Sequence, residues 1–329
     1  EKCQELVLAD NKLTAMSVHV MGGLRDLRVC DVRNNQLTEI KAPIWFLPMV
    51  RNIDVRGNAI SSPPMAVVRK GKGAVMSYFK ALEVAAKTKK LSLNNTELTY
   101  VPNEVMTLKT VETLTLDGNL LNSLPAQIGG MIALQSLSAK GNQLASIPDT
   151  LSSLHALKTL LLDNNQLSGL PIPSMLLLTR LATLGLSSNQ LVTPPFELFR
   201  SSTLTSITLA SNPDLRSPPP KLTSDDARKA DVIQFLRKEA MCIRSGRLKL
   251  SEQGAVTFPV EVLRVGDLTE IILSHNKIES LPPEIGQLTM MRKLNLEDNL
   301  LDDLPPEIGN CVALADLRLE ENRLSELPK

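Results

Sequence analysis

Leucine and other apolar residues return along the chain at a fixed spacing, separated by polar positions. Residues 134–144 read Leu-Gln-Ser-Leu-Ser-Ala-Lys-Gly-Asn-Gln-Leu, and the same pattern returns at 157–167 and 181–191. The step is 23 or 24 residues, and reading outward gives about thirteen units over 329 residues. A repeat of this period predicts a solenoid in which each unit packs only on its neighbours.

Each part of the repeat predicts a local structure. The Leu-x-Leu alternation predicts a short strand whose leucines enter the core while the intervening residues face out. The asparagine that follows can satisfy backbone groups of the turn, so we expect a ladder of asparagines inside the bend. Its members would be Asn119, Asn142, Asn165 and Asn189. The segment Leu-Pro-Pro-Glu-Ile-Gly at 281–286 predicts short helical or irregular turns on the opposite, convex side.

The pattern L-x-x-L-x-L-x-x-N-x-L resembles the leucine-rich repeat. The resemblance implies an α/β solenoid, a curved horseshoe with a parallel sheet on its concave side. The motif L-P-x-E-I-G-x-L resembles that of the cytoplasmic leucine-rich-repeat proteins of the Ras-suppressor and plant intracellular Ras-group type. This resemblance extends over essentially the whole chain.

The period is interrupted twice, from Val50 to Thr88 and from Leu204 to Ser245. Each interruption follows a run of prolines and contains an amphipathic helical pattern. An offset of 157 residues aligns the two patterns and the two units that restart after them, which indicates a duplicated module. The first insert resembles the segment that interrupts the repeats of the leucine-rich repeat-containing protein 40 family.

The sequence therefore predicts one continuous solenoid with two helical inserts. In the second insert, Thr223-Ser224-Asp225 offers a helix N-cap. The predicted segments are repeats 1–3 in residues 1–60, an insert at 61–87, repeats 4–9 in 88–215, an insert at 216–244 and repeats 10–13 in 245–329.

The composition of the chain argues against nucleic acid and a membrane as its partners. The net charge of +1 gives no reason to expect nucleic acid, and no apolar run approaches the length of a membrane span. Four scattered cysteines favour a reducing, cytoplasmic setting. The chain opens on a strand and stops within a repeat, so we expect a longer chain or a neighbour that covers its ends.

The outward positions of the concave strands are the default binding surface of such a solenoid. Aromatic residues make up only 3% of the chain, so arginines would supply most of the binding energy there. Solvated strand faces are the alternative interpretation. The candidate protein-binding residues are Asp31, Arg33, Asp54, Arg56, Leu161, Ile272, Arg292, Glu297, Arg318 and Glu320.

The inserts are a competing surface. Residues 61–87 contain five basic and one acidic residue, and residues 216–247 contain eight basic and four acidic, so each carries about +4. Docking to an acidic partner or to a membrane surface is one interpretation. The one we favour is a solvated outer face of helices that join two modules. The basic residues concerned are Arg69, Lys70, Lys72, Arg228, Lys229, Arg237 and Lys238.

The acids, hydroxyls and histidines follow the repeat period and do not converge on one place, so we expect no enzyme, metal or cofactor. The sequence predicts a non-catalytic scaffold for protein–protein interaction. Two alternatives stay open: the targeting segment of a larger signalling enzyme (a kinase, GTPase or ligase) and a structural subunit of a large assembly.

Overall fold

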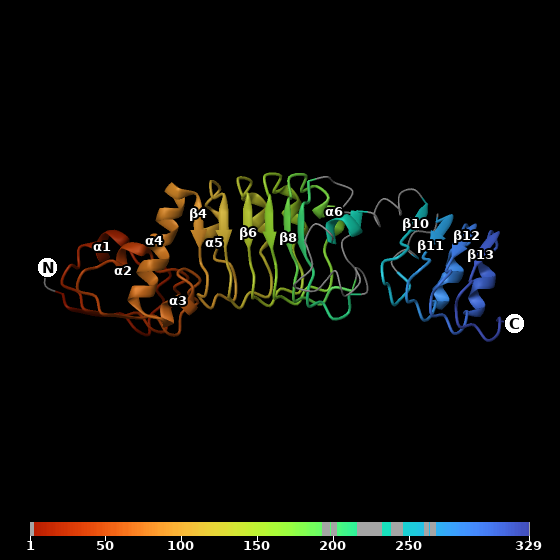
Figure 1. Ribbon diagram of the computed structural model, residues 1–329. Helices are drawn as coiled ribbons and strands as arrows, with labels where there is room; N and C mark the ends of the chain where they lie inside the picture. Colours follow the sequence, from red (N-terminus) through yellow and green to blue (C-terminus); the bar gives the residue numbers. More distant parts are fainter. Residues whose placement is uncertain are drawn as a thin grey trace. The chain divides into compact units, whose positions relative to one another are not determined.

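The computed structural model describes residues 3–192, 198, 203–215, 232–237, 246–259, 263 and 268–328. The chain divides into two compact units, Glu1–Gln166 and Leu167–Lys329. Unit 1 is coloured red to yellow and unit 2 green to blue (Figure 1).

Unit 1 alternates short strands with short helices. Its first sheet has the order β1-β2-β3, and in the second sheet β4, β5, β6 and β7 pair in sequence order. The elements are β1 Glu5–Val7, α1 Val18–Gly22, β2 Val29–Asp31, α2 Ala42–Trp45, β3 Asn52–Asp54, α3 Met65–Arg69, α4 Lys72–Thr88, β4 Lys90–Ser92, α5 Asn103–Met106, β5 Thr113–Thr115, η1 Ala126–Gly130, β6 Ser136–Ser138, η2 Asp149–Ser153 and β7 Thr159–Leu161.

Unit 2 continues the same alternation. Strands β8 and β9 pair in parallel, and a four-stranded sheet has the order β10-β11-β12-β13. The elements are α6 Ile172–Met175, β8 Thr183–Gly185, β9 Ser206–Thr208, β10 Arg247–Lys249, β11 Glu270–Ile272, η5 Pro283–Gln287, β12 Lys293–Asn295, η6 Pro306–Asn310 and β13 Asp316–Arg318.

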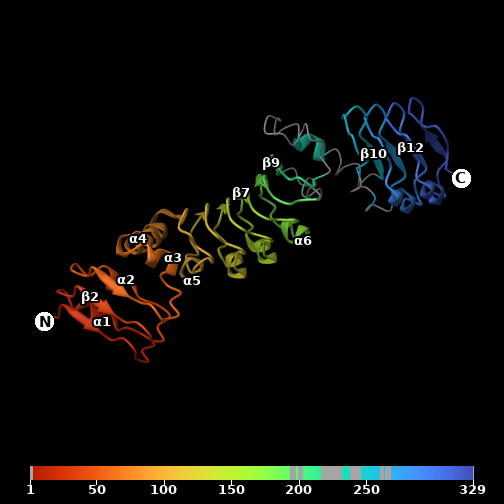
Figure 2. The ribbon, with the colours of Figure 1, turned by 90° about the horizontal axis from the view of Figure 1, so that it is seen from below.

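The strands are parallel and in register at the repeat period, as the sequence predicts. Leu114, Leu137 and Leu160 lie beside one another in β5, β6 and β7, and all three are fully buried. Each of these strands has three residues, and its middle side chain points into the core while the two beside it point to the other face. Figure 2 shows the strands of unit 1 along one side of the ribbon, the sheet side, and the short helices along the other, the helix side.

The predicted asparagine ladder is confirmed. In the sixth repeat, Asn142 Oδ1 accepts the N–H of Leu121 at 3.0 Å, and its Nδ2 donates to the carbonyls of Leu116 and Ala139 at 3.0 Å each. Each such amide therefore ties its own turn to the preceding repeat. The unit after the first insert has Thr96 at this place, and its hydroxyl donates to Leu93 O at 2.8 Å. The threonine thus reproduces one of the three bonds, because it carries a single donor.

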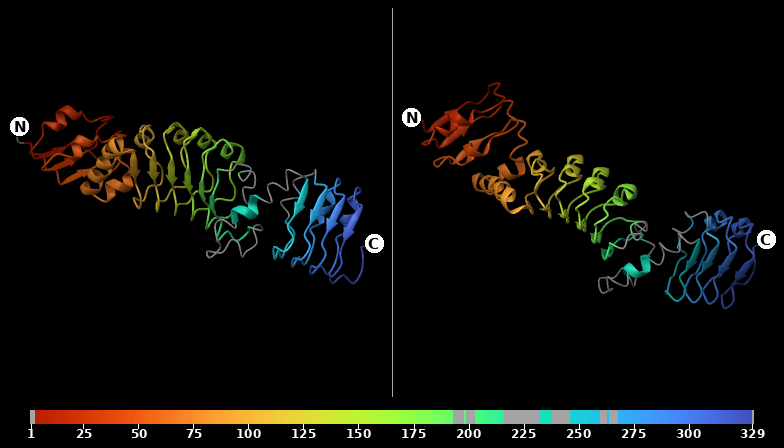
Figure 3. Two further views of the ribbon diagram at one scale, coloured as in Figure 1. Left: turned by 45° about the horizontal axis from the view of Figure 1, so that its top comes forward. Right: turned by 90° about the horizontal axis from the view of Figure 1, so that it is seen from above.

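The helix side consists of short helical turns, also as predicted. Successive turns such as η1 and η2 pack directly on one another (Figure 3, yellow). Trp45 is buried on this side, and its indole N–H donates to Ile40 O at 3.3 Å. The side chain therefore serves packing.

The first insert contains two helices where the apolar pattern suggests one amphipathic stretch. Helix α3 ends before Gly71, whose φ of +90° breaks the run, and α4 starts at Lys72. Val75, Tyr78 and Ala85 are the buried residues of α4, which contacts α2 and β4. Figure 1 shows α4 alongside β4.

Most of the second insert, including Thr223-Ser224-Asp225, lies outside the described residues. Within it, residues 232–237 form a helical segment. Val232, Phe235 and Leu236, which are three and four residues apart as on one face of a helix, are buried there.

Candidate protein-binding surface

We call the outward-facing residues of the strands the sheet face of each unit. The residues of the sheet face vary, whereas the residues that point inward from the same strands are uniformly apolar. The middle residue of every strand of unit 1 from β4 to β7 is a buried leucine. The residues that precede these leucines change in size and charge. They are Lys90, Thr113, Ser136 and Thr159, and in β1 to β3 the corresponding residues are Glu5, Val29 and Asn52.

The predicted residues of β2 and β3 form one ion-pair network. Arg33 holds both carboxylate oxygens of Asp31, with Nε–Oδ1 and Nη2–Oδ2 distances of 2.9 and 2.8 Å. Arg56 holds Asp54 in the same way, and Arg33 Nε lies 3.6 Å from Asp54 Oδ2. These hydrogen bonds lower the pKa of both carboxyl groups. The arginines are therefore oriented in advance, but the neighbouring aspartates already neutralise much of their charge.

The sheet of β4 to β7 is mostly neutral on its outer face. Thr115 Oγ1 donates to Ser92 Oγ at 3.0 Å, and Ser138 Oγ donates to Asp117 Oδ1 at 2.6 Å. Leu161, a predicted site residue, takes the corresponding place in β7 and is half-buried. Its side chain gives this part of the face an apolar position among hydroxyl groups.

In unit 2 the charges alternate along the first residues of the strands. Arg247 of β10 pairs with Glu270 of β11 at 3.4 Å, and Lys293 of β12 pairs with Asp316 of β13 at 3.1 Å. Hydrogen bonds from Lys293 and then Arg318 lower the pKa of Asp316. Arg247, Glu270 and Asp316 were not among the residues predicted from the sequence. Positive and negative residues alternate at this repeat position from one strand to the next, and that alternation is the signal that could have identified them.

The other predicted residues of unit 2 lie on or beside the same sheet. Ile272 is the half-buried third residue of β11, and Arg292 is exposed immediately before β12. The backbone N–H of half-buried Glu297 donates to Asn295 Oδ1 at 2.9 Å, and Glu320 is exposed after β13. Arg318 Nε lies 3.3 Å from Asp316 Oδ1. The candidates thus fall into separate groups, namely the ion-pair network beside β2 and β3, Leu161 in β7, and the residues on or beside β11 to β13.

The basic residues of the first insert contact the chain itself. Lys70 Nζ lies 3.0 Å from Glu97 Oε1 and donates to Asn95 O at 3.3 Å. Lys72 Nζ donates to Leu47 O at 2.7 Å and to Val50 O at 2.8 Å, and burial lowers the pKa of Lys72. Arg69 is exposed at the end of α3.

In the second insert, Arg237 Nη2 donates to Leu204 O at 2.9 Å. The other basic candidates of this insert are Arg228, Lys229 and Lys238, and they lie outside the described residues.

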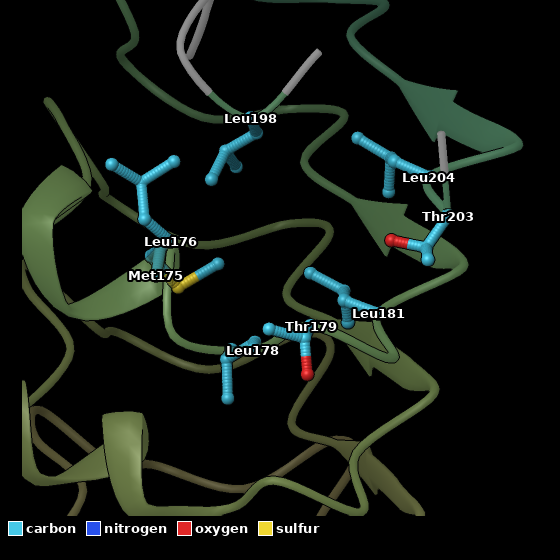
Figure 4. A pocket seen from close by; sticks show the side chains of 8 residues that line it. All are labelled: Met175, Leu176, Leu178, Thr179, Leu181, Leu198, Thr203 and Leu204. Carbon is cyan, nitrogen blue, oxygen red and sulfur yellow. The ribbon is translucent and has the colours of Figure 1, made fainter. Parts of the chain in front are cut away.

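A small cavity of about 80 Å³ in unit 2 lies between α6 and the residues that precede β8 and β9 (Figure 4). Its lining is apolar apart from two threonine hydroxyls. The lining residues are Met175, Leu176, Leu178, Thr179, Leu181, Leu198, Thr203 and Leu204. A cavity of this size and lining has room only for a small apolar group.

The described part of the chain has no group of three or more His, Cys, Asp or Glu side chains placed to hold a metal ion. Among the described helices, none is both long and apolar enough to cross a membrane. Cys3, Cys30 and Cys311 carry free thiols. Burial raises the pKa of Cys30 to about 11, so this thiol stays protonated at neutral pH.

A family model described as leucine rich repeat matches residues 267–324. The parallel strands, the short helical turns and the asparagine ladder give the described residues the fold of a leucine-rich-repeat solenoid. Leucine-rich-repeat proteins generally use their extended sheet face to bind other proteins.

Several solved structures are similar to this chain. One, a leucine-rich-repeat protein of Leptospira interrogans, is 28% identical over 98% of this chain and 79% of the other, with a TM-score of 0.39. An internalin of Listeria monocytogenes is 18% identical over 98% and 82%, with a TM-score of 0.37. The functional domain of Listeria monocytogenes InlJ is 15% identical over 94% and 61%, with a TM-score of 0.34. No curated protein sequence matches this chain.

Proposed function

We propose that this leucine-rich-repeat protein is a non-catalytic scaffold that binds a protein partner on its sheet face. The observation that carries the proposal is the contrast between the two sides of each strand. Inward residues repeat as leucine, isoleucine or cysteine with a bonded asparagine ladder, whereas outward residues change in size and charge from one repeat to the next. A rigid frame that presents varied side chains is suited to recognition of one partner surface.

A cytoplasmic location is part of the proposal. The free thiols of Cys3, Cys30 and Cys311 support it, since thiols persist in a reducing compartment. The L-P-x-E-I-G-x-L wording, which resembles intracellular repeat proteins, supports it as well.

Affinity capture with the full chain tests the proposal. Leu161→Lys and Ile272→Lys each place a charge on a sheet face, whereas Ile132→Lys and Met290→Lys place the same charge on residues that are 66% and 52% exposed outside the strands. We expect at least one sheet-face variant to lose, by about tenfold or more, a partner that both controls retain, because a buried unpaired charge disrupts an interface. Equal recovery by all four variants would place binding elsewhere.

A further inference from the structure

Basic residues recur at one position of the repeat, two residues before the buried middle residue of a strand. In unit 1 they are Arg28, Arg51, Lys89 and Lys158. Lys89 Nζ lies 2.7 Å from Glu112 Oε1, and Lys158 Nζ donates to Gln135 Oε1 at 3.1 Å. The side chains of Arg28 and Arg51 are exposed and have no hydrogen-bond or ion-pair partner among the described residues. These two arginines, the free pair, therefore keep their full capacity to bind an anion.

The members of the free pair are neighbours. The backbone N–H of Arg51 donates to Arg28 O at 2.8 Å, and the residues that follow them, Val29 and Asn52, are partners in the sheet register. Equivalent positions of paired strands lie about 4.8 Å apart. Both guanidinium groups can therefore reach the same acidic segment.

The other two arginines of these repeats are already neutralised. Arg33 and Arg56, which follow β2 and β3, each hold a carboxylate through two hydrogen bonds. The carboxylates belong to Asp31 and Asp54, at the ends of the same two strands. Each strand thus has a free arginine before its first residue and a carboxylate-bound arginine after its last one.

An exposed apolar side chain adjoins the free pair. Val29 follows Arg28 directly and is 36% exposed. Glu5, its sheet partner in β1, and Asp26, two residues before Arg28, form no ion pair with either arginine in the described part of the chain. A partner can therefore cover Val29 while its carboxylates bind Arg28 and Arg51.

We propose that Arg28 and Arg51 anchor an acidic segment of a protein partner, with an apolar residue of that segment over Val29. The inference rests on the proposed function and names the class of partner. A guanidinium group binds a carboxylate through two parallel hydrogen bonds, and arginine is enriched among the residues that dominate interface energy. A polyanion such as nucleic acid fits less well, because Asp31 and Asp54 cancel the charge of the other arginines and leave two free cations.

Fluorescence anisotropy of the full chain with labelled synthetic peptides tests the proposal. One peptide repeats Glu-Glu-Val, and the other repeats Gln-Gln-Val. We expect the wild type to bind the glutamate peptide about tenfold or more tightly than the glutamine peptide, because only a carboxylate forms charged hydrogen bonds with the free pair. Arg28→Gln/Arg51→Gln should lose this preference. Lys80→Gln/Lys109→Gln removes the same charge from exposed residues outside the strands and should keep it.

Thermal unfolding should give the same midpoint for both double variants and the wild type, since the exchanged side chains have no partners among the described residues. The absence of a preference in the wild type, or an equal loss of it in both double variants, would overturn the anchor. Tighter binding of single-stranded DNA than of the glutamate peptide, lost in Arg28→Gln/Arg51→Gln, would assign the free pair to nucleic acid instead.

Affinity capture separates this inference from the proposed function. A partner that Leu161→Lys or Ile272→Lys loses and Arg28→Gln/Arg51→Gln retains would contradict the anchor and leave binding by the sheet face intact. A partner that Arg28→Gln/Arg51→Gln loses by about tenfold, and that the lysine double variant retains, would support the anchor.

Discussion

Two segments of unit 2 have the same local sequence, Pro-Pro-Glu-Ile-Gly, but different neighbours. Residues 282–286 are covered by the next repeat, whereas no further described repeat packs on residues 305–309. Both form the same short helix, η5 and η6. Ile285 is fully buried and Ile308 is only half-buried. Local sequence thus sets the conformation, and the neighbouring repeat sets how much each residue contributes to stability.

The comparison extends to the strands of the same two repeats. Leu294 of β12 is fully buried, whereas Leu317, the same repeat position in β13, is 40% exposed. Asn299 is 3% exposed and donates to Leu273 O and Leu296 O. A residue of a repeat protein therefore has to be judged together with the two repeats that flank it.

The largest expected effect is the difference in stability lost when Leu294 and Leu317 are each replaced by alanine. Leu294→Ala should lower the free energy of unfolding by about 3–4 kcal/mol, because it removes a fully packed side chain and leaves a cavity. Leu317→Ala should cost about 1–2 kcal/mol, since solvent already reaches its side chain. Native-state hydrogen exchange of residues 293–318 measures both. Equal losses would show that Leu317 is as well covered as Leu294.

The second effect concerns the glycines of the shared motif. A Cβ at Gly286 would lie 2.5 Å from the carbonyl oxygen of Glu307, whereas a Cβ at Gly309 would meet nothing within 4 Å. Gly286→Ala should therefore cost on the order of 2 kcal/mol through overpacking, and Gly309→Ala less than about 0.5 kcal/mol. Thermal unfolding of the two variants is the measurement. A stable Gly286→Ala variant would mean that η5 and η6 move apart easily.

The smallest expected effect is the pH dependence of stability that comes from His275, in the turn after β11. His275 Nδ1 lies 2.9 Å from Asp298 Oδ2, while the next repeat places Glu321 at this turn position. The hydrogen bond to Asp298 raises the pKa of His275 above its ordinary value of 6.5. The pair therefore stabilises the fold fully below pH 6.5, and its contribution is lost as the pH rises through the folded pKa.

An NMR titration of His275 checks this prediction. The pKa should lie above 6.5 in the wild type and fall toward that value in Asp298→Asn. Glu321→Gln serves as the control and should leave it nearly unchanged. A pKa that does not respond to Asp298→Asn would show that the two side chains are not paired in solution.

The inserts show where sequence reasoning reached its limit. The interruptions of the period predicted both of them, and the offset of 157 residues aligned their helical patterns. They did not indicate that Gly71 separates α3 from α4, or that Lys72 points at Leu47 O and Val50 O. Long basic side chains have many rotamers, so their bonding partners depend on the surrounding fold and not on a pattern of residue types.

The sequence by itself determined the parallel repeat, the inward leucines and the asparagine ladder. These contacts join residues that are about one period apart, so a periodic sequence specifies them directly. Only the tertiary structure decided which charged residues form ion pairs. Asp31 pairs with Arg33 of its own repeat, whereas Lys293 of β12 pairs with Asp316 of the neighbouring strand β13. It also decided that Gly286 is closely covered and Gly309 is open. The physical reason is that such contacts depend on distances of a few ångströms between neighbouring repeats, which residue types alone do not fix.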